Sequence, residues 1–134
     1  MPFPTFSRII FTDVSILSSR AYFSLKQHIV ENTLTGNSKG GIYECAIADA
    51  LYKKGYQIYF YKNETTKREI DVVIQKDGMV VPIEVKGGNT RANSLKSLMK
   101  NHKDISYGYK FADGNIGVGE DGIITLPLYM IAFI

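Results

Sequence analysis

Residues 68–86 read REIDVVIQKDGMVVPIEVK, two runs rich in Val and Ile on either side of Asp77-Gly78. An Asp-Gly pair between such runs is a strong signal for a two-residue β-turn. The sequence therefore predicts a β-hairpin, and this turn places Asp71 on the first strand opposite Glu84 on the second. Directly opposed residues have Cβ atoms about 4.5–5.5 Å apart. The hairpin is thus expected to bring two carboxylates together.

Glu84 and Lys86 lie two residues apart in the second strand, so their side chains share one face. The simpler interpretation is a solvated face on which Lys86 pairs with Glu69 across the hairpin. The alternative is a site, because opposed carboxylates repel unless a cation lies between them. Two hard oxygen ligands at this separation suit Mg²⁺. Pro82 lacks an N–H, and a bulge near it would shift the register by one residue.

A helix is predicted over residues 41–55, GIYECAIADALYKKG, with Gly55 just past its end. The polar, Gly-rich residues 35–41 are expected to form a break before it. One stripe of this helix holds Glu44, Ile47, Ala48 and Leu51. Glu44 is the only charged member of an otherwise apolar stripe, so it is a candidate third acid at the end of the sheet. The alternative is an acid of the first helical turn, favoured there by the helix dipole.

The remaining segments complete an α/β pattern in which helices cover a mixed sheet. A strand is predicted at 56–62, a short helix at 94–102, a strand at 105–111, a Gly-rich surface loop at 113–122, and an apolar tail at 123–134 that packs on the body. Residues 38–134 are expected to form the core, with 1–37 as a strand and helix segment packed on it. The chain is expected to be one domain.

Composition narrows the classes of function. The 134 residues carry a net charge of +3, which is compatible with a nucleic-acid partner. Cys45 is the only cysteine, which excludes an internal disulfide and a zinc site built from cysteines. The apolar tail is too short to span a bilayer and the first residues do not have the layout of a signal peptide. We therefore expect a cytoplasmic protein with no membrane partner.

The acids and the lysine together suit hydrolysis of a phosphodiester. Asp71 and Glu84 would hold Mg²⁺ or Mn²⁺, which polarises the phosphate and lowers the pKa of a bound water. Lys86 would orient or deprotonate that water, or stabilise the developing negative charge. Glu44 would bind the metal through water or position Lys86.

These residues, in this order, resemble the PD-(D/E)XK nuclease-like superfamily, whose restriction-endonuclease-like core runs helix, three antiparallel strands, helix, strand. Its signature is an acid on the first helix, an Asp on the second strand and (D/E)-x-K on the third, which here are Glu44, Asp71 and Glu84-Val85-Lys86. Ile70 stands where the superfamily often has Pro. More closely, about residues 8–134 resemble the C-terminal domain of unknown function of bacterial and archaeal AAA+-type ATPases. The shared motifs are Gly40 to Glu44, YFYKN, EIDVVI, PIEVK and Ser94-Leu95.

The resemblance implies a metal-dependent nuclease acting on nucleic acid, most often DNA, with an AAA+-type ATPase domain as a partner and a homodimer as a possible state. No G-x-x-x-x-G-K-[ST] motif occurs, so ATP hydrolysis is not predicted for this chain. The alternative is a catalytically inactive module that binds DNA or regulates an ATPase. Candidate phosphate contacts are Lys67, Arg68, Arg91, Lys96 and Lys100, for which a solvated surface is the simpler account.

Overall fold

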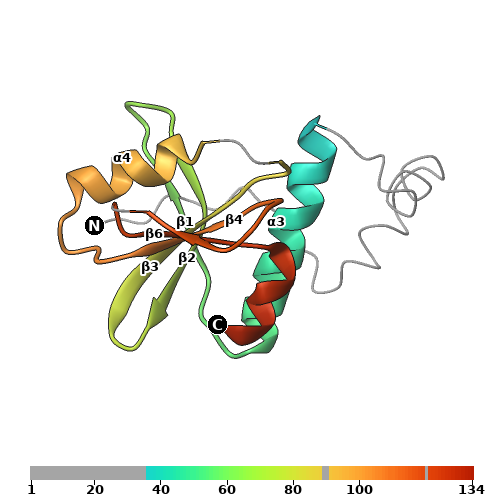
Figure 1. Cartoon of the computed structure of the whole chain (residues 1–134). Coiled ribbons are helices and arrows are strands. Elements are labelled where there is room, and N and C mark those ends of the chain that lie inside the picture. The colour runs from blue at the N-terminus through green and yellow to red at the C-terminus, as the bar shows by residue number, and fades with distance from the viewer. Residues whose placement is uncertain (1–35, 89–90, 120) are drawn as a thin grey trace.

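The computed structural model describes residues 36–88, 91–119 and 121–134. They form a mixed sheet in the order β1-β2-β3-β4-β6-β5, with α3 and α4 on opposite sides of it (Figure 1). The elements are α3 (Gly36–Lys53), β1 (Tyr59–Lys62), β2 (Glu69–Lys76), β3 (Met79–Val85), α4 (Asn93–Asn101), β4 (Gly108–Phe111), β5 (Gly117–Val118), β6 (Ile123–Leu126) and the 3-10 helix η1 (Leu128–Phe133). The predicted α/β class and element order are confirmed, while the segment predicted at 1–37 lies outside the described residues except for its last two.

The β2–β3 hairpin has the predicted turn. Asp77 and Gly78 both adopt positive φ, 52° and 76°, as a two-residue turn of type I′ requires. The ladder pairs run from Lys76 with Met79 to Val72 with Ile83. Pro82 pairs with Val73 inside this ladder, so it causes no shift and the predicted register is confirmed.

A β-bulge interrupts β2 on its other edge, where it pairs with β1. The ladder pairs Tyr59 with Val73 and Tyr61 with Ile70, so β2 contains one residue more than β1 over this stretch. The extra residue reverses the alternation of side chains. Ile70 and Val73 therefore both belong to the core beneath α4. Asp71 lies inside this bulge.

Helix α3 begins at Gly36, so the predicted Gly-rich break at 35–41 is wrong. Glycine disfavours a helix by about 1 kcal/mol relative to alanine but does not forbid helical dihedral angles. The helix is anchored further along by Ile47 and Leu51, which are buried against the sheet. Its end matches the prediction, because Gly55 has a φ of 91°. The N–H groups of Gly55 and Tyr56 donate to carbonyls of the last turn, the Schellman arrangement.

The C-terminal residues contribute more to the sheet than the sequence indicated. Residues 123–126 form β6, parallel to β4, and part of the predicted loop 113–122 forms the short edge strand β5. The final residues pack on the body as predicted, with η1 beside α3 (Figure 1). The Lys54 ammonium donates to the carbonyl oxygens of Ile131 and Ala132 at 3.3 and 2.7 Å, which ties η1 to the end of α3.

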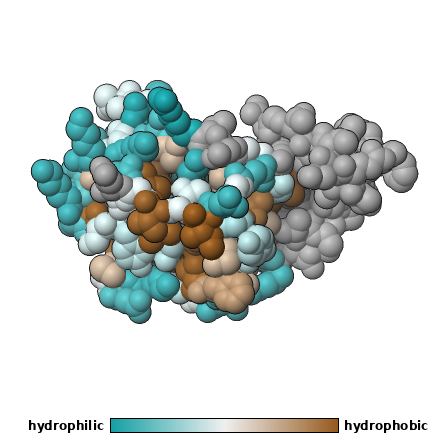
Figure 2. Space-filling view, in the orientation of Figure 1, coloured by the Kyte–Doolittle hydropathy of each residue, from teal (hydrophilic) through white to brown (hydrophobic). Residues whose placement is uncertain are grey.

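Two apolar cores fill the space on the two sides of the sheet. The α3 side contains Leu51, Ile83 and Phe111, all fully buried. The α4 side contains Leu95 and Ile70 with their smaller set of neighbours. Figure 2 shows apolar side chains at the middle of one face with hydrophilic side chains around them. No described helix is long and apolar enough to cross a bilayer.

Candidate functional site

The end of β3 carries a buried ion pair. The Lys86 ammonium lies 2.7 Å from Oε1 of Glu84, and the two side chains are 30% and 4% exposed respectively. The other oxygen, Oε2, accepts a hydrogen bond from the Leu95 N–H at 3.2 Å, at the beginning of α4. Glu84, on β3, therefore contacts both the Lys86 ammonium and the beginning of α4. Of the two side chains in the ion pair, that of Lys86 is the more exposed. Glu69 forms an ion pair with Lys62 at 3.2 Å.

Asp71 lies one residue beyond the last β2–β3 pair, where the register would place it opposite Glu84. Its Oδ2 accepts a hydrogen bond from the Val85 N–H at 2.7 Å. The next N–H, that of Lys86, donates to Phe111 on β4, so the Val85 N–H points to the β2 side because successive N–H groups of a strand point to opposite edges. The Asp71 carboxylate thus replaces a ladder bond. We call Asp71, Glu84 and Lys86 the polar cluster.

Glu44 comes from the other side of the sheet. It is half-buried on α3, one turn before Ile47, and α3 packs on the face opposite α4. Glu84 instead bonds to α4. Within the described residues, no three acidic, His or Cys side chains are grouped so as to hold a metal ion. The roles predicted for Glu44 and for the polar cluster therefore stay predictions.

The donor set of the polar cluster fits one kind of metal site. Mg²⁺ is commonly held by one or two carboxylates, with waters and substrate phosphates as its other ligands. A carboxylate has about four acceptor positions, and each oxygen of Glu84 has one partner among the described residues. Asp71 and Glu84 would be the two carboxylates that hold the ion.

A basic groove lies on the β4–β6 side of the polar cluster, with a cavity of about 300 Å³. Its lining residues are Arg91, Ala92, Lys96, Lys110, Gly119, Asp121, Ile123 and Thr125. We call this the basic groove. Lys110 was not among the predicted contacts. It is the β4 partner of Glu84 in a parallel pair of strands. Parallel strands are not joined by a tight turn, so no turn motif in the sequence indicates this pairing.

The predicted phosphate contacts are distributed over four places. Arg91 and Lys96 line the basic groove. Arg68 lines a smaller cleft of about 50 Å³, which also includes Ser94 and Ser97 of α4. Lys67 lies in the turn after β1, 3.5 Å from Glu64, and Lys100 is exposed on α4. The structure therefore brings two of the five predicted residues together.

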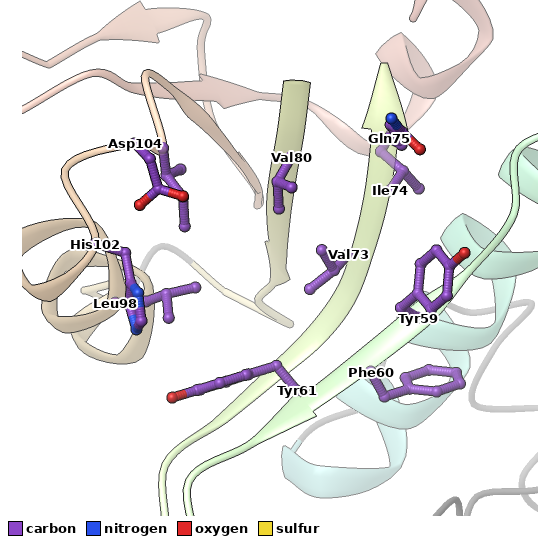
Figure 3. Close-up of a pocket in the computed structure, with 11 residues that line it drawn as sticks. Tyr59, Phe60, Tyr61, Val73, Ile74, Gln75, Val80, Leu98, His102 and Asp104 are labelled. Atoms are coloured by element: carbon purple, nitrogen blue, oxygen red, sulfur yellow. The ribbon is translucent and has the colours of Figure 1, made fainter. Parts of the chain in front are cut away.

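A second large cavity, of about 340 Å³, lies between α4 and strands β1 to β3. Leu98 of α4 and Val73 of β2 point toward each other across it, and Tyr61 of β1 extends toward α4 (Figure 3). His102, which ends α4, also lines it. No member of the polar cluster lines this cavity. Its walls are largely apolar, so it is a separate feature from the ion pair.

A family model described as a domain of unknown function, DUF4143, matches residues 39–131. The chain belongs to the DUF4143 family. The matched part of this DUF4143 domain includes the polar cluster and the basic groove, together with nearly all of α3. No curated protein and no solved structure matched the chain.

Proposed function

We propose that this DUF4143 domain hydrolyses phosphodiester bonds of nucleic acid in a reaction that depends on Mg²⁺ or Mn²⁺. The observation that supports it is the Lys86 ammonium 2.7 Å from buried Glu84, with Asp71 bound to the N–H of the residue between them. Two carboxylates and a cation at one strand end are the groups that phosphoryl chemistry needs. The resemblance to the nuclease-like superfamily points to the same residues.

Each residue of the polar cluster has a role in this proposal. Asp71 and Glu84 would hold the metal ion, which when bound polarises the phosphate and lowers the pKa of a bound water. Lys86 is the member that meets the substrate, because its side chain is 30% exposed whereas that of Glu84 is 4% exposed. Its ammonium would stabilise negative charge on the phosphate oxygens. Glu84 would hold Lys86 in place through the ion pair.

A second candidate is a module that does not cleave, and that binds DNA or regulates an AAA+-type ATPase. One observation favours it. Both Glu84 oxygens already have partners inside the domain, and among the described residues no third ligand completes a metal-binding group. In this function the ion pair serves to position α4 on the sheet.

Cleavage assays distinguish the two candidates. Labelled duplex, single-stranded and branched DNA and single-stranded RNA would be incubated with the full chain in Mg²⁺, in Mn²⁺ and in EDTA. The nuclease proposal expects metal-dependent cleavage that falls by about 100-fold or more in Asp71→Asn and in Lys86→Met. Lys62→Met, which removes the same charge from an exposed pair, should cleave normally. Absence of cleavage on every substrate, or cleavage unchanged in both variants, would overturn it.

A further inference from the structure

We propose that the basic groove binds the phosphate backbone of a nucleic-acid duplex next to the polar cluster. Its role in presenting a substrate rests on the proposed function, whereas binding itself does not. Among the described residues that line the groove, Arg91, Lys96 and Lys110 carry positive charge and Asp121 carries negative charge. Like charges gathered on a concave surface raise the local potential and attract an anion. The excess of positive charge among the described lining residues therefore suits phosphate.

Asp121 organises the groove as well as reducing its charge. Its Oδ1 accepts a hydrogen bond from the Ile123 N–H at 3.3 Å, which fixes the carboxylate against β6. Its Oδ2 lies 3.8 Å from the Lys96 ammonium. A Cβ at Gly119 would lie 2.5 Å from Oδ1, so a larger residue there would require the carboxylate to shift. Lys96 is thus oriented toward the groove by a carboxylate that the loop holds in place.

The sheet connects the groove to the polar cluster. Glu84 on β3 pairs with Lys110 on β4, which pairs with Thr125 on β6. Adjacent strands are about 4.8 Å apart, so this row extends about 10 Å from Glu84. Each strand of a duplex carries one phosphate per about 3.4 Å of helix axis. A backbone with one phosphate at Lys86 would therefore have further phosphates over Lys110 and the basic groove.

The composition of the groove favours a duplex over a single strand. Proteins that bind single strands combine basic grooves with aromatic side chains on which the bases stack. No aromatic residue is among the described residues that line the basic groove. Cations without a stacking platform contact phosphates and carry no sequence information. We therefore expect duplex binding that depends on salt and little on sequence.

The test is binding of a labelled duplex in EDTA, where metal-dependent cleavage cannot occur. Fluorescence anisotropy over a series of salt concentrations would compare the full chain with the triple variant Arg91→Ala, Lys96→Ala, Lys110→Ala. Each phosphate contact contributes about 0.9 to the slope of log affinity against log salt. The triple variant should lower that slope by about 2.7. The double variant Arg91→Ala, Lys96→Ala spares the half-buried Lys110 and should lower it by about 1.8.

A matched control removes the same charge elsewhere. The control variant carries Lys62→Ala, Lys76→Ala and Lys103→Ala, none of which lines the groove. Its slope should change by less than about 1. Three results would overturn the proposal: equal slopes for the groove and control variants, tighter binding of a single strand than of the duplex, or binding of polyglutamate but not of the duplex. The last result would assign the groove to an acidic protein partner.

The outcomes also separate this proposal from the proposed function. If duplex binding depends on the basic groove and no substrate is cleaved, the groove proposal stands and the nuclease proposal fails. If cleavage depends on Lys86 and the groove variants cleave and bind normally, the opposite holds. Lys86→Met should largely abolish cleavage and lower the salt slope by no more than about 0.9, the contribution of its one phosphate contact.

Discussion

Glu84 and Lys86 form a buried ion pair, so their contributions to stability are coupled. We expect the losses of stability in the two single variants to add up to more than the loss in the double variant. Lys86→Met would leave the Glu84 carboxylate buried, with the Leu95 N–H as its remaining partner among the described residues. Removal of one member of a buried pair generally costs about 3–5 kcal/mol. Because the Lys86 side chain is 30% exposed, water can reach one side of the site, and we expect a loss of about 2–3 kcal/mol.

Glu84→Gln should cost less, about 1 kcal/mol, because the amide oxygen can still accept from Leu95 and the ammonium of Lys86 can be hydrated. The double variant removes both charges, and apolar or neutral replacements of a buried pair are often close to neutral. We expect it to lie within about 1 kcal/mol of the unsubstituted chain. The losses of the two single variants would then add up to about 2–4 kcal/mol more than the loss of the double variant.

Urea unfolding of the full chain near neutral pH measures all four free energies of unfolding. Lys62→Met is the control, because the Lys62–Glu69 pair is 45% and 41% exposed and such pairs contribute about 0.2–1 kcal/mol. The reasoning is refuted if Lys86→Met costs no more than this control. It is also refuted if the double variant loses the sum of the two single variants, since the charges would then be uncoupled.

Four further predictions concern stability. Asp71→Ala removes the acceptor of the Val85 N–H and should cost about 1–3 kcal/mol by urea unfolding, whereas Asp71→Asn should cost less. Gly41→Ala, in an exposed part of α3 where no atom of another described element lies within 4 Å of the new Cβ, should stabilise by about 0.5–1 kcal/mol. Gly108→Ala, whose Cβ would lie 3.0 Å from a side-chain carbon and from a carbonyl oxygen, should destabilise by about 1–3 kcal/mol. Thermal unfolding would show whether the first glycine substitution raises the melting temperature and the second lowers it. Burial raises the pKa of Tyr109 above its ordinary 10.0, so the unfolded chain loses this proton at a lower pH than the folded chain does. Stability should therefore fall as the pH rises above about 10. In urea unfolding at a series of alkaline pH values, Tyr109→Phe should show a smaller fall.

Contrary results have clear meanings. Equal stability of the two Asp71 variants would show that its hydrogen bond to the backbone contributes little. A destabilising Gly41→Ala would show that α3 needs a glycine at that position. An unchanged alkaline fall in Tyr109→Phe would assign the effect to other groups, with Tyr107 as the first candidate, since burial raises its pKa too.

The hairpin and its register could be predicted because their signals are local. Asp77-Gly78 specifies a turn with two positive φ angles, and the register of both strands follows from that turn. The Schellman end of α3 at Gly55 was equally readable. Local signals therefore brought Asp71 to the end of β3, where it accepts from the Val85 N–H, and put Lys86 beside Glu84.

Other parts of the site depend on pairings between distant residues. The approach of Lys110 to Glu84 comes from the parallel β3–β4 pairing, and parallel strands are joined by long connections without a turn signal. The bulge at Asp71 depends on how β1 meets β2. The hydrogen bond from Leu95 to Glu84 depends on where α4 docks on the sheet. None of these contacts leaves a pattern in neighbouring residues.

The start of α3 shows a different limit. Gly40 and Gly41 have low helix propensity, yet both are helical, because propensity is a small term beside the packing of a whole helix. Similarly, residues 123–126 read as an apolar tail and form an interior strand. Apolar runs of this length do not distinguish a strand from a packed tail.

The position of β6 has a consequence for how the domain is made in the cell. This strand lies between β4 and β5 in the sheet, although it comes near the end of the sequence. A nascent chain that stops before Ile123 would leave one edge of β4 without its neighbour, with open N–H and C=O groups available to other chains. Premature termination is therefore expected to produce aggregates or chaperone-bound chains, and a shortened domain with partial activity is not expected.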